Sequence, residues 1–379
     1  MSKTSALFWT EAKRLSSIQL SLIRKVMEAA PPNSINLALG ELGFPLPNSL
    51  KEKAKEILDY GTPVYTPNAG LAELREAIAQ DYHSNYSANN ICVCNGAEEA
   101  VFITLMSLLN PGDCIAFPDP DYTAYNSIAS IYGAKVKRLP FIDSFKAIDF
   151  SLWESILSQN VKIVLLSCPS NPSGFFFSEA QAIAFGEICN RYGIIVIVDE
   201  IYSRLYYSQA PIYLEGYVQH IIRIGGVSKS HCMSGWRIGW IASPLEIVAS
   251  MIKAKQYVST CSNWLSQKLA VYALSEAGLQ ESDKIRLMLK NSRDLFLNAF
   301  KQDKPSHIID IHAPDASPYI MLKLDMDDLD YSAKLASAGV IVVPGRAFGD
   351  SAIGWIRVNI GVEPLYLEKA LALWMEATI

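Results

Sequence analysis

The segment IIRIGGVSKSHCMSGWRIGWI, residues 221–241, decides how the rest of the chain is interpreted. Lys229 lies in a turn of small and polar residues between two apolar runs, and Arg237 follows beside Gly235 and Trp236. Apolar surroundings and nearby cations disfavour an ammonium group, so such a lysine has a lowered pKa and can attack a carbonyl. A fixed guanidinium can bind a phosphate through two hydrogen bonds. The segment therefore predicts a site for a ligand that carries both groups.

One ligand with both groups is pyridoxal 5'-phosphate (PLP), whose aldehyde would form a Schiff base with Lys229 while its phosphate contacts Arg237. The alternative is a solvated loop lysine and an unrelated surface arginine. For any single lysine or arginine that alternative is the better one. The PLP hypothesis therefore depends on the rest of the chain.

Composition favours a compact protein that acts on small molecules. Of the 379 residues, 50% are hydrophobic and 19% are charged, which is typical of globular domains. The length predicts two or three domains, or one large domain with an appendage. A net charge of −5, without a basic run interleaved with aromatic residues, argues against a nucleic-acid partner.

The cysteine, histidine and N-terminal patterns indicate the redox state of the thiols, the metal content and the cellular location to expect. Seven scattered cysteines, an odd number, do not form a disulfide framework, and five widely spaced histidines give no zinc pattern, so we expect reduced thiols and no metal. The N-terminus lacks a signal-peptide core, and no charge-free stretch is long enough to span a membrane. We expect a cytoplasmic protein without a membrane partner.

Short apolar runs alternate with predicted helices, such as 97–109 and 178–192, from residue 91 onwards. The runs ICVC, CIAFP, KIVLL, IIVIV and IIRI are typical of a mostly parallel sheet that is buried on both faces. Ligands of such sheets bind beyond the carboxyl ends of the strands. We therefore expect one crevice to collect the residues that follow these runs, which are Gly96, Tyr122, Asn171, Asp199 and Lys229.

The chain changes character after about residue 244. Two long helices are predicted at 245–277 and 282–300, followed by the strands IIDIHA, YIMLKL and VIVVP and a final helix in PLYLEKALALWMEA. The N-terminal part is predicted to be an arm with Phe8 and Trp9, which covers a subunit or frays, and a helix around 18–30. We expect a large cofactor-binding domain at 47–285 and a smaller α+β domain made of 1–46 and 286–379.

The motif SKSHCMSGWRIG around Lys229 resembles the Schiff-base motif of the class I/II aminotransferases, which are fold-type I PLP enzymes similar to aspartate aminotransferase. Other motifs match the same family in the same order between residues 35 and 363. These are NGAEEA, PDPDYTAY, CPSNPSG, VDEIY, VVPGRAFG and WIRVNIG. The resemblance implies an α/β fold-type I transferase, with a mostly parallel central sheet in a large domain and a smaller α+β domain.

The resemblance assigns the PLP phosphate to the start of one helix and to the segment around Lys229. Amides at a helix start point along the positive end of the helix dipole, which suits a phosphate. Tyr65 would reach the phosphate of a neighbouring subunit, which implies a homodimer. One departure is Gly226, where the family usually has a phosphate-binding serine. The remaining phosphate contacts are expected from Gly96, Ala97, Glu98, Ser228 and Arg237.

The ring of the cofactor would be held by residues that follow three of the predicted strands. By resemblance, Tyr122 stacks on the pyridine ring, while Asn171 and Tyr202 share its phenolic oxygen. A carboxylate at Asp199 can keep the pyridine nitrogen protonated, which makes the ring an electron sink. Arg357 would clamp the substrate α-carboxylate in a bidentate pair, with Asn171 and Gly40 nearby.

The implied activity is transfer of an amino group between an α-amino acid and a 2-oxo acid. Lys229 would hold the cofactor, be displaced by the substrate amine and then move a proton from the α-carbon to C4' of the cofactor, with Asp199 and Tyr202 as the other catalytic residues. Leu42 and Gly43 replace the family's usual Pro-Asp, which puts the acceptor pocket in doubt. Alternatives are another PLP enzyme of this fold, such as a lyase, a cyclising synthase or an oxidase, and a non-catalytic regulator with the PLP fold.

Two classes of nucleotide-binding protein are excluded because their sequence motifs are absent. The VDE segment could end the acidic strand of a P-loop ATPase, but the chain lacks a G-x-x-x-x-G-K-[ST] motif. A Rossmann dehydrogenase is likewise unsupported, because no G-x-G-x-x-G follows the early strands.

Overall fold

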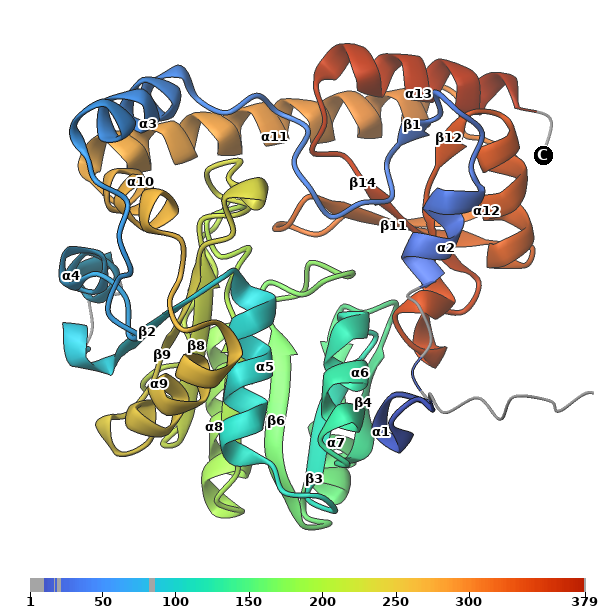
Figure 1. Ribbon diagram of the computed structural model, residues 1–379. Coiled ribbons are helices and arrows are strands. Elements are labelled where there is room, and N and C mark those ends of the chain that lie inside the picture. Colours follow the sequence, from blue (N-terminus) through green and yellow to red (C-terminus); the bar gives the residue numbers. More distant parts are fainter. Residues whose placement is uncertain (1–9, 17, 19–21, 82–85, 378–379) are drawn as a thin grey trace, which may run out of the picture.

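The computed structural model describes residues 10–16, 18, 22–81 and 86–377, so the predicted arm with Phe8 and Trp9 lies outside the described residues. Figure 1 shows two parts, one built on an eight-stranded sheet and the other on a four-stranded sheet. The parallel strands of the large sheet point their carboxyl ends toward the smaller part. This arrangement places the ends of the parallel strands at the junction between the two parts.

The large sheet is mostly parallel, as predicted. Its order is β2-β9-β8-β7-β6-β3-β4-β5, and β9 is antiparallel to both β2 and β8. Because β9 lies between β2 and β8 and is antiparallel to both, β2 runs in the same direction as β8, β7, β6, β3 and β4. The strands are β2 (Ile91–Cys94), β3 (Cys114–Asp119), β4 (Lys135–Ile142), β5 (Ala147–Ile148), β6 (Val161–Ser167), β7 (Ile195–Asp199), β8 (Ile221–Gly226) and β9 (Gly239–Ala242).

Both faces of this sheet are covered by helices, which explains the unbroken apolar runs. In β6, Ile163 and Leu165 pack with α5, α6 and α9, whereas Val164 and Leu166 pack with α7 and α8 on the opposite face. A third group of helices, α3, α4 and α10, covers β2 and β9. The helices are α3 (Asn48–Tyr60), α4 (Ala72–Asp81), α5 (Ala97–Leu108), α6 (Thr123–Ile131), α7 (Phe150–Leu157), α8 (Glu179–Arg191), α9 (Leu245–Ser259) and α10 (Trp264–Ala273).

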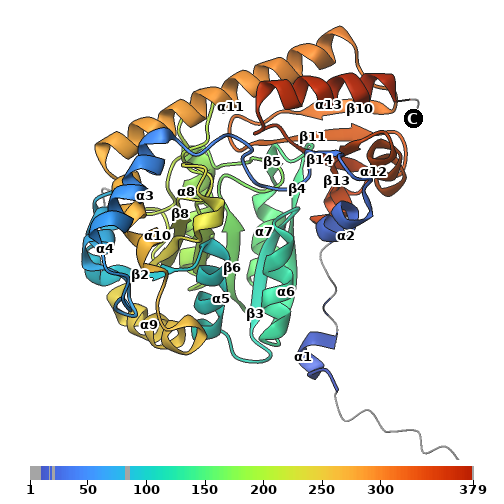
Figure 2. The same cartoon turned by 45° about the horizontal axis from the view of Figure 1, so that its top comes forward.

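The smaller part has an antiparallel sheet of order β10-β11-β14-β13. Figure 2 shows α11 and α13 side by side over this sheet. The N-terminal segment joins this part, because Ile35 in β1 pairs with Val340 in β12. The elements are α1 (Lys13–Ser16), α2 (Leu22–Ala29), β1 (Ile35–Asn36), α11 (Glu276–Gln302), β10 (Ile308–His312), β11 (Tyr319–Leu324), α12 (Asp328–Ser337), β12 (Val340–Ile341), β13 (Val343–Pro344), β14 (Trp355–Asn359) and α13 (Pro364–Glu376).

Two helix predictions were wrong in extent. The single helix predicted at 245–277 is two helices, because α9 ends at Ser259, Thr260 has a φ of 58°, and the Asn263 side chain caps α10 by accepting from the Ser266 amide at 2.9 Å. The helix predicted at 282–300 begins earlier, since Ser275 caps it. As α11 runs unbroken through residue 285, the division into 47–285 and the remainder stays a prediction.

Candidate active site

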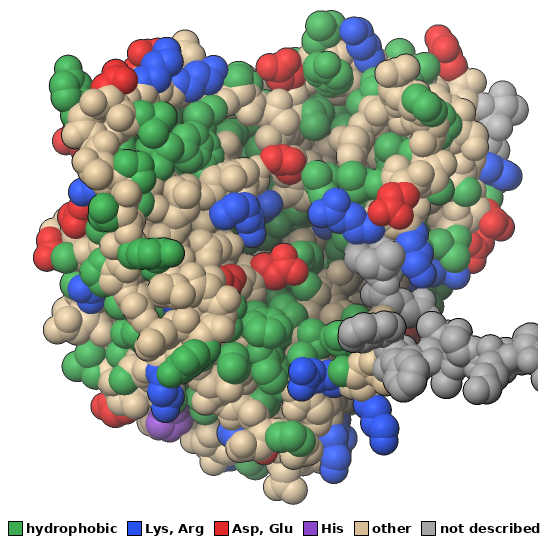
Figure 3. Space-filling model, in the orientation of Figure 1, with side chains coloured by type: hydrophobic (Ala, Val, Ile, Leu, Met, Phe, Trp, Pro, Cys, Tyr) green, Lys and Arg blue, Asp and Glu red, His purple; other side chains and the backbone are tan. Residues whose placement is uncertain are grey.

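The five residues predicted to follow strand ends lie at one edge of the large sheet. β2, β3, β6, β7 and β8 all end there; Asp199 is the last residue of β7, and each of the other four strands is followed by a turn that carries one of these residues. In Figure 3, charged side chains of both signs lie around the hollow between the two parts of the molecule. The candidate site is built on this edge and is closed by residues of the smaller part.

Lys229 is half-buried, and its Nζ donates a hydrogen bond to the Gly40 carbonyl at 2.6 Å. Burial lowers the pKa of Lys229 to about 8; Glu41 opposes this shift, and the cations Arg237 and Arg357 add to it. An ordinary lysine has a pKa near 10.4. A substantial fraction of the Lys229 amine is therefore neutral, and nucleophilic, at physiological pH.

Asp199 ends β7 with its carboxylate buried. Tyr125 donates its hydroxyl to one carboxylate oxygen at 2.9 Å, and the Ile201 amide donates to the other at 3.1 Å. Burial raises the pKa of Asp199 to about 6, against the lowering effect of both hydrogen bonds and of Lys229. At neutral pH the carboxylate is mostly ionised, and a protonated ring nitrogen beside it would be stabilised.

Gly96 and Arg237 form a cradle where β2 passes into α5. Gly96 has a φ of +94°, a conformation that favours glycine, and a Cβ added there would lie 2.5 Å from Arg237 Nη2 and would displace the guanidinium. Arg237 donates to the Ser234 carbonyl at 3.0 Å and the Asn95 carbonyl at 3.3 Å. Of the other predicted phosphate contacts, Ala97 and Glu98 start α5 and Ser228 is buried beside Lys229.

An ion pair between Lys255 and Glu99 stabilises the turn that precedes Gly96 in this cradle. Lys255, on α9, lies 3.1 Å from Glu99 Oε2 and is fully buried. The same carboxylate accepts from the Asn95 backbone amide at 2.6 Å and from the Asn95 side chain at 3.0 Å. The pair therefore fixes the residue that precedes Gly96. Sequence reasoning missed it, because nothing in the spacing of Glu99 and Lys255 indicates that they meet.

Arg357 is buried in the middle of β14, with Tyr319 and Phe348 around its guanidinium. Its Cζ lies 4.2 Å from the Tyr319 ring centroid and 4.7 Å from that of Phe348. Nη1 donates to Asn171 Oδ1 at 2.7 Å, and Nη2 donates to the Ala38 carbonyl. Within the described residues no carboxylate lies within ion-pair distance of this guanidinium, and its buried Nε has no acceptor. An anionic ligand would satisfy both needs.

Tyr202 contacts a residue that the sequence did not single out. Its hydroxyl and that of Tyr319 are 2.7 Å apart, and both side chains are buried. Gly40 packs against them, since a Cβ added there would clash with the Tyr319 hydroxyl and lie 3.8 Å from that of Tyr202. Tyr319, Tyr125 and Phe348 are thus the neighbours that sequence reasoning missed. No spacing signal marks them, although Tyr125 lies one helical turn after Tyr122.

Tyr65 is not gathered with the other predicted residues. Its side chain is 88% exposed, in the turn-rich loop between α3 and α4. The remaining predicted residues line the junction, with Tyr122 placed edge-on against Tyr125 at a centroid distance of 5.4 Å. Tyr65 therefore lacks the enclosure that the other aromatic residues of the candidate site share.

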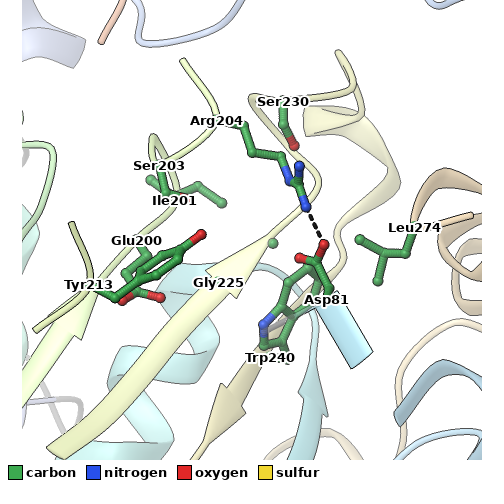
Figure 4. Close-up of a pocket in the computed structure, with 11 residues that line it drawn as sticks. Asp81, Glu200, Ile201, Ser203, Arg204, Tyr213, Gly225, Ser230, Trp240 and Leu274 are labelled. Atoms are coloured by element: carbon green, nitrogen blue, oxygen red, sulfur yellow. Dashed lines mark hydrogen bonds and ion pairs between the residues drawn. The ribbon is translucent and has the colours of Figure 1, made fainter. Parts of the chain in front are cut away.

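Gly226 is the last residue of β8, three residues before Lys229, and it lines a small pocket shown in Figure 4. Arg204 and Asp81 form an ion pair in this pocket, which lies next to Glu200 and Ser230. A Cβ at Gly226 would lie 2.9 Å from the Ile238 carbonyl and 3.0 Å from Ile201 Cδ1. The close pairing of β8 with β9 therefore excludes a side chain at the position where the resembling family has serine.

Two further searches of the structure concern metals and membranes. In the ranges given above for the described chain, no group of three or more His, Cys, Asp and Glu side chains could hold a metal ion. Nor is any helix in that part of the chain both long and apolar enough to cross a membrane.

Comparison with known proteins agrees with this geometry. Residues 32–372 match the model of the family described as aminotransferase class I and II. A probable aspartate aminotransferase of Methanocaldococcus jannaschii is 31% identical over 96% of this chain and 99% of its own. A probable N-acetyl-LL-diaminopimelate aminotransferase of Bacillus subtilis is 32% identical over 93% and 92%. The crystal structure of an aspartate aminotransferase from Thermotoga maritima superposes with a TM-score of 0.86 at 26% identity, over 96% and 98% of the two chains. The chain is therefore an aminotransferase that belongs to the class I and II family.

Proposed function

We propose that this aminotransferase uses pyridoxal 5'-phosphate bound at the edge of the large sheet, with Lys229 as the covalent and proton-transferring residue. The observation that carries the proposal is the buried Lys229 amine, whose pKa is lowered to about 8 chiefly by burial. A lysine in that state is suited to react with an aldehyde. Class I and II aminotransferases are PLP enzymes, so the family supports the same assignment.

The residues present fit each part of the cofactor. The cradle of Gly96 and Arg237 offers backbone amides and a guanidinium to a phosphate, and no carboxylate of the described chain is paired with Arg237. Asp199 is a buried carboxylate that can hold a proton on a ring nitrogen. Tyr122 and Asn171 lie on the turns that follow β3 and β6 at the same edge. These are the residues we assign to phosphate, ring nitrogen, ring face and phenolic oxygen.

When bound, PLP supplies an aldehyde that reacts with amines and a protonated ring that withdraws electrons from the carbon beside the amine. Once the substrate amine has displaced Lys229, its free Nζ would accept the proton from the substrate α-carbon and deliver it to C4' of the cofactor. Its lowered pKa makes the neutral form, which accepts a proton, far more populated near neutral pH than in an ordinary lysine. Asp199 would favour the protonated form of the ring nitrogen, because Tyr125 and Ile201 hold its carboxylate in place.

Arg357 is the residue we assign to the substrate α-carboxylate. Two of its nitrogens are already held by Asn171 and Ala38, which fixes the guanidinium plane, and Nε lacks an acceptor. Orientation by a bound carboxylate would place the α-carbon on the side of Lys229. The substrates in this proposal are an α-amino acid and a 2-oxo acid. Aspartate is the first to test, because relatives carry that name.

The test is made on purified protein supplied with PLP. We expect a visible absorbance band, an adduct at Lys229 after borohydride reduction, and loss of the band when a suitable amino acid is added without an oxo acid. A panel of L-aspartate, L-glutamate, L-alanine and L-phenylalanine with 2-oxoglutarate then gives the substrate class. Protein that takes up no PLP, or an adduct on another lysine, would contradict the proposal. Release of ammonia in place of amino transfer would contradict it as well.

We further propose that two copies pair, with Tyr65 of each reaching the phosphate of the other. The support is that Tyr65 is 88% exposed, and that Val64 in the same loop and Tyr60 at the end of α3 are exposed as well. Sedimentation of the protein with PLP should give a dimer, and Tyr65→Phe should weaken PLP binding about tenfold. A fully active monomer would contradict this proposal. A cytoplasmic location also stays a prediction.

A further inference from the structure

Asp121 is a buried carboxylate that the proposed mechanism does not use. It lies between the end of β3 and the start of α6, one residue before Tyr122, and is 1% exposed. Burial raises the pKa of Asp121 to about 7, and the negative charge of Asp199 adds to this shift. Across the described residues no cation lies within ion-pair distance of Asp121. A buried carboxylate without a nearby cation lowers the stability of the fold unless several hydrogen-bond donors satisfy it.

Three donors do surround Asp121, and they come from two strand ends. Oδ1 accepts from the Tyr122 amide at 2.7 Å and from the Ser167 hydroxyl at 2.6 Å, and Oδ2 accepts from the Ser167 amide at 3.3 Å. Ser167 is the last residue of β6. The carboxylate therefore bridges the turns that follow β3 and β6, which carry Tyr122 and Asn171.

The bridge continues to Arg357. The Ser167 hydroxyl, which donates to Asp121, accepts from the Asn171 backbone amide at 2.9 Å. The Asn171 side chain in turn accepts from Arg357 Nη1 at 2.7 Å. One chain of hydrogen bonds thus joins Tyr122, Asp121, Ser167, Asn171 and Arg357. It begins at the residue assigned to the ring face and ends at the residue assigned to the substrate carboxylate.

The smaller part of the molecule meets the same turn. The Asp121 amide donates to the Phe348 carbonyl at 3.1 Å, and the Phe348 ring lies against the Arg357 guanidinium. Asp121 is therefore tied to the surroundings of Arg357 by two routes, one through Ser167 and Asn171 and the other through Phe348.

We infer that Asp121 is a positioning residue, which holds Tyr122 against the ring of the cofactor and, through Ser167, holds Asn171 and Arg357 for the substrate carboxylate. This inference rests on the proposed function. A role only in stabilising the turn would require the bond to the Tyr122 amide, but not the path from Ser167 to Asn171.

The experiment compares holoenzyme variants by two readouts. Visible circular dichroism of bound PLP reports the tilt of its ring, and the KM and kcat for the best amino acid of the panel above report the substrate side. Asp121→Ala should lower the dichroic band at least twofold and raise KM about tenfold or more. Asp121→Asn keeps Oδ1 as acceptor for the Tyr122 amide and the Ser167 hydroxyl and loses only the longer bond from the Ser167 amide to Oδ2, so it should keep both quantities within about threefold of wild type.

Ser167→Ala breaks the path to Asn171 and removes one of the three donors to Asp121, but it leaves the bond from the Tyr122 amide to Asp121 intact. It should raise KM about tenfold, with kcat and the dichroic band nearly unchanged, because the Asn171 amide loses its acceptor while the Tyr122 amide keeps Asp121. Ser170→Ala is the matched control. Ser170 is 2% exposed in the same loop, but its hydroxyl has no hydrogen-bond partner, so neither quantity should change.

The result that would overturn the inference is equal KM values for Ser167→Ala and Ser170→Ala. This pair gives the answer even if Asp121→Ala does not fold. An Asp121→Asn variant as impaired as Asp121→Ala would also overturn it, since charge rather than positioning would then be required. Failure of the proposed function is recognised separately, because wild-type protein would then show no PLP band at all.

Discussion

The two sheets contribute to the candidate site in different ways. The eight-stranded sheet presents its groups on turns directly after strand ends, where backbone amides, Lys229 and Asp199 converge. The four-stranded sheet presents Arg357 from the middle of β14, where neighbouring strands and aromatic rings enclose it. In the proposed function the first sheet would hold the cofactor, and the second would orient the substrate.

This difference matters because the two kinds of position are held by different forces. A turn after a strand is fixed by hydrogen bonds to its own backbone, such as those that the Glu99 and Arg237 side chains make with Asn95. A buried arginine in a strand is fixed by packing against residues far along the chain, here Tyr319, Phe348 and Ala38. Substitutions in the two sheets should therefore affect different kinetic quantities.

The largest effect is expected at Lys229, on the cofactor side. Lys229→Ala removes the only group we assign to proton transfer at the α-carbon, so kcat should fall by at least about 10³-fold. Binding of the amino acid carboxylate should persist, because Arg357 belongs to the other sheet. Stopped-flow and steady-state assays measure both. Lys229→Arg is the matched control: it keeps a cation but cannot become neutral near pH 7, and should be as inactive. Turnover retained in Lys229→Ala would mean that another residue performs the transfer.

The two arginines give the next test, since each belongs to one sheet. Arg357→Met leaves the substrate carboxylate without its partner, and should lower kcat/KM for amino acids by about 10²- to 10³-fold with PLP affinity nearly unchanged. Arg237→Met should do the reverse, weakening PLP binding while amino acid KM changes little at saturating PLP. Titration with PLP and steady-state kinetics separate the two. If both variants changed PLP affinity and the kinetics with amino acids to the same extent, the two sheets would not have separate roles in holding cofactor and substrate.

The same distinction explains what the sequence could and could not predict. Apolar runs mark strand ends, so Gly96, Asn171, Asp199 and Lys229 could be assigned to one edge before their distances were known. The environment of Arg357 could not, because Tyr319 and Phe348 meet it only after β11 and the turn after β13 pack together. The break between α9 and α10 was missed for a related reason. The cap at Asn263 is a local signal, but the contacts of Gln267 with Thr66 and Leu71 depend on tertiary neighbours.

A smaller effect is expected from the ion pair beneath the cradle. Lys255→Met leaves the Glu99 carboxylate largely buried without its cation, which should lower the free energy of unfolding by about 3 kcal/mol. Loosening of the Asn95 turn should weaken PLP binding roughly tenfold, without an equal change in amino acid KM. Chemical denaturation and PLP titration measure these quantities. Lys253→Met, on the exposed face of the same helix, is the control and should change neither. If Lys255→Met raises amino acid KM more than it weakens PLP binding, the pair supports the substrate side instead.

The smallest expected effect concerns pH. The depressed pKa of Lys229, about 8, means that its amine is protonated below that pH and loses the proton as pH rises through it. Capture of PLP requires the neutral amine, so the capture rate of PLP-free protein should rise about fivefold between pH 7 and pH 8 and level off above pH 9. Glu41 opposes the depression of this pKa, so Glu41→Gln should move the midpoint to lower pH and speed capture at pH 7. Rapid-mixing absorbance at several pH values measures both midpoints. A midpoint near 10 would mean that burial does not activate this lysine. A shift of the Glu41→Gln profile to higher pH would mean that Glu41 does not raise the pKa of Lys229.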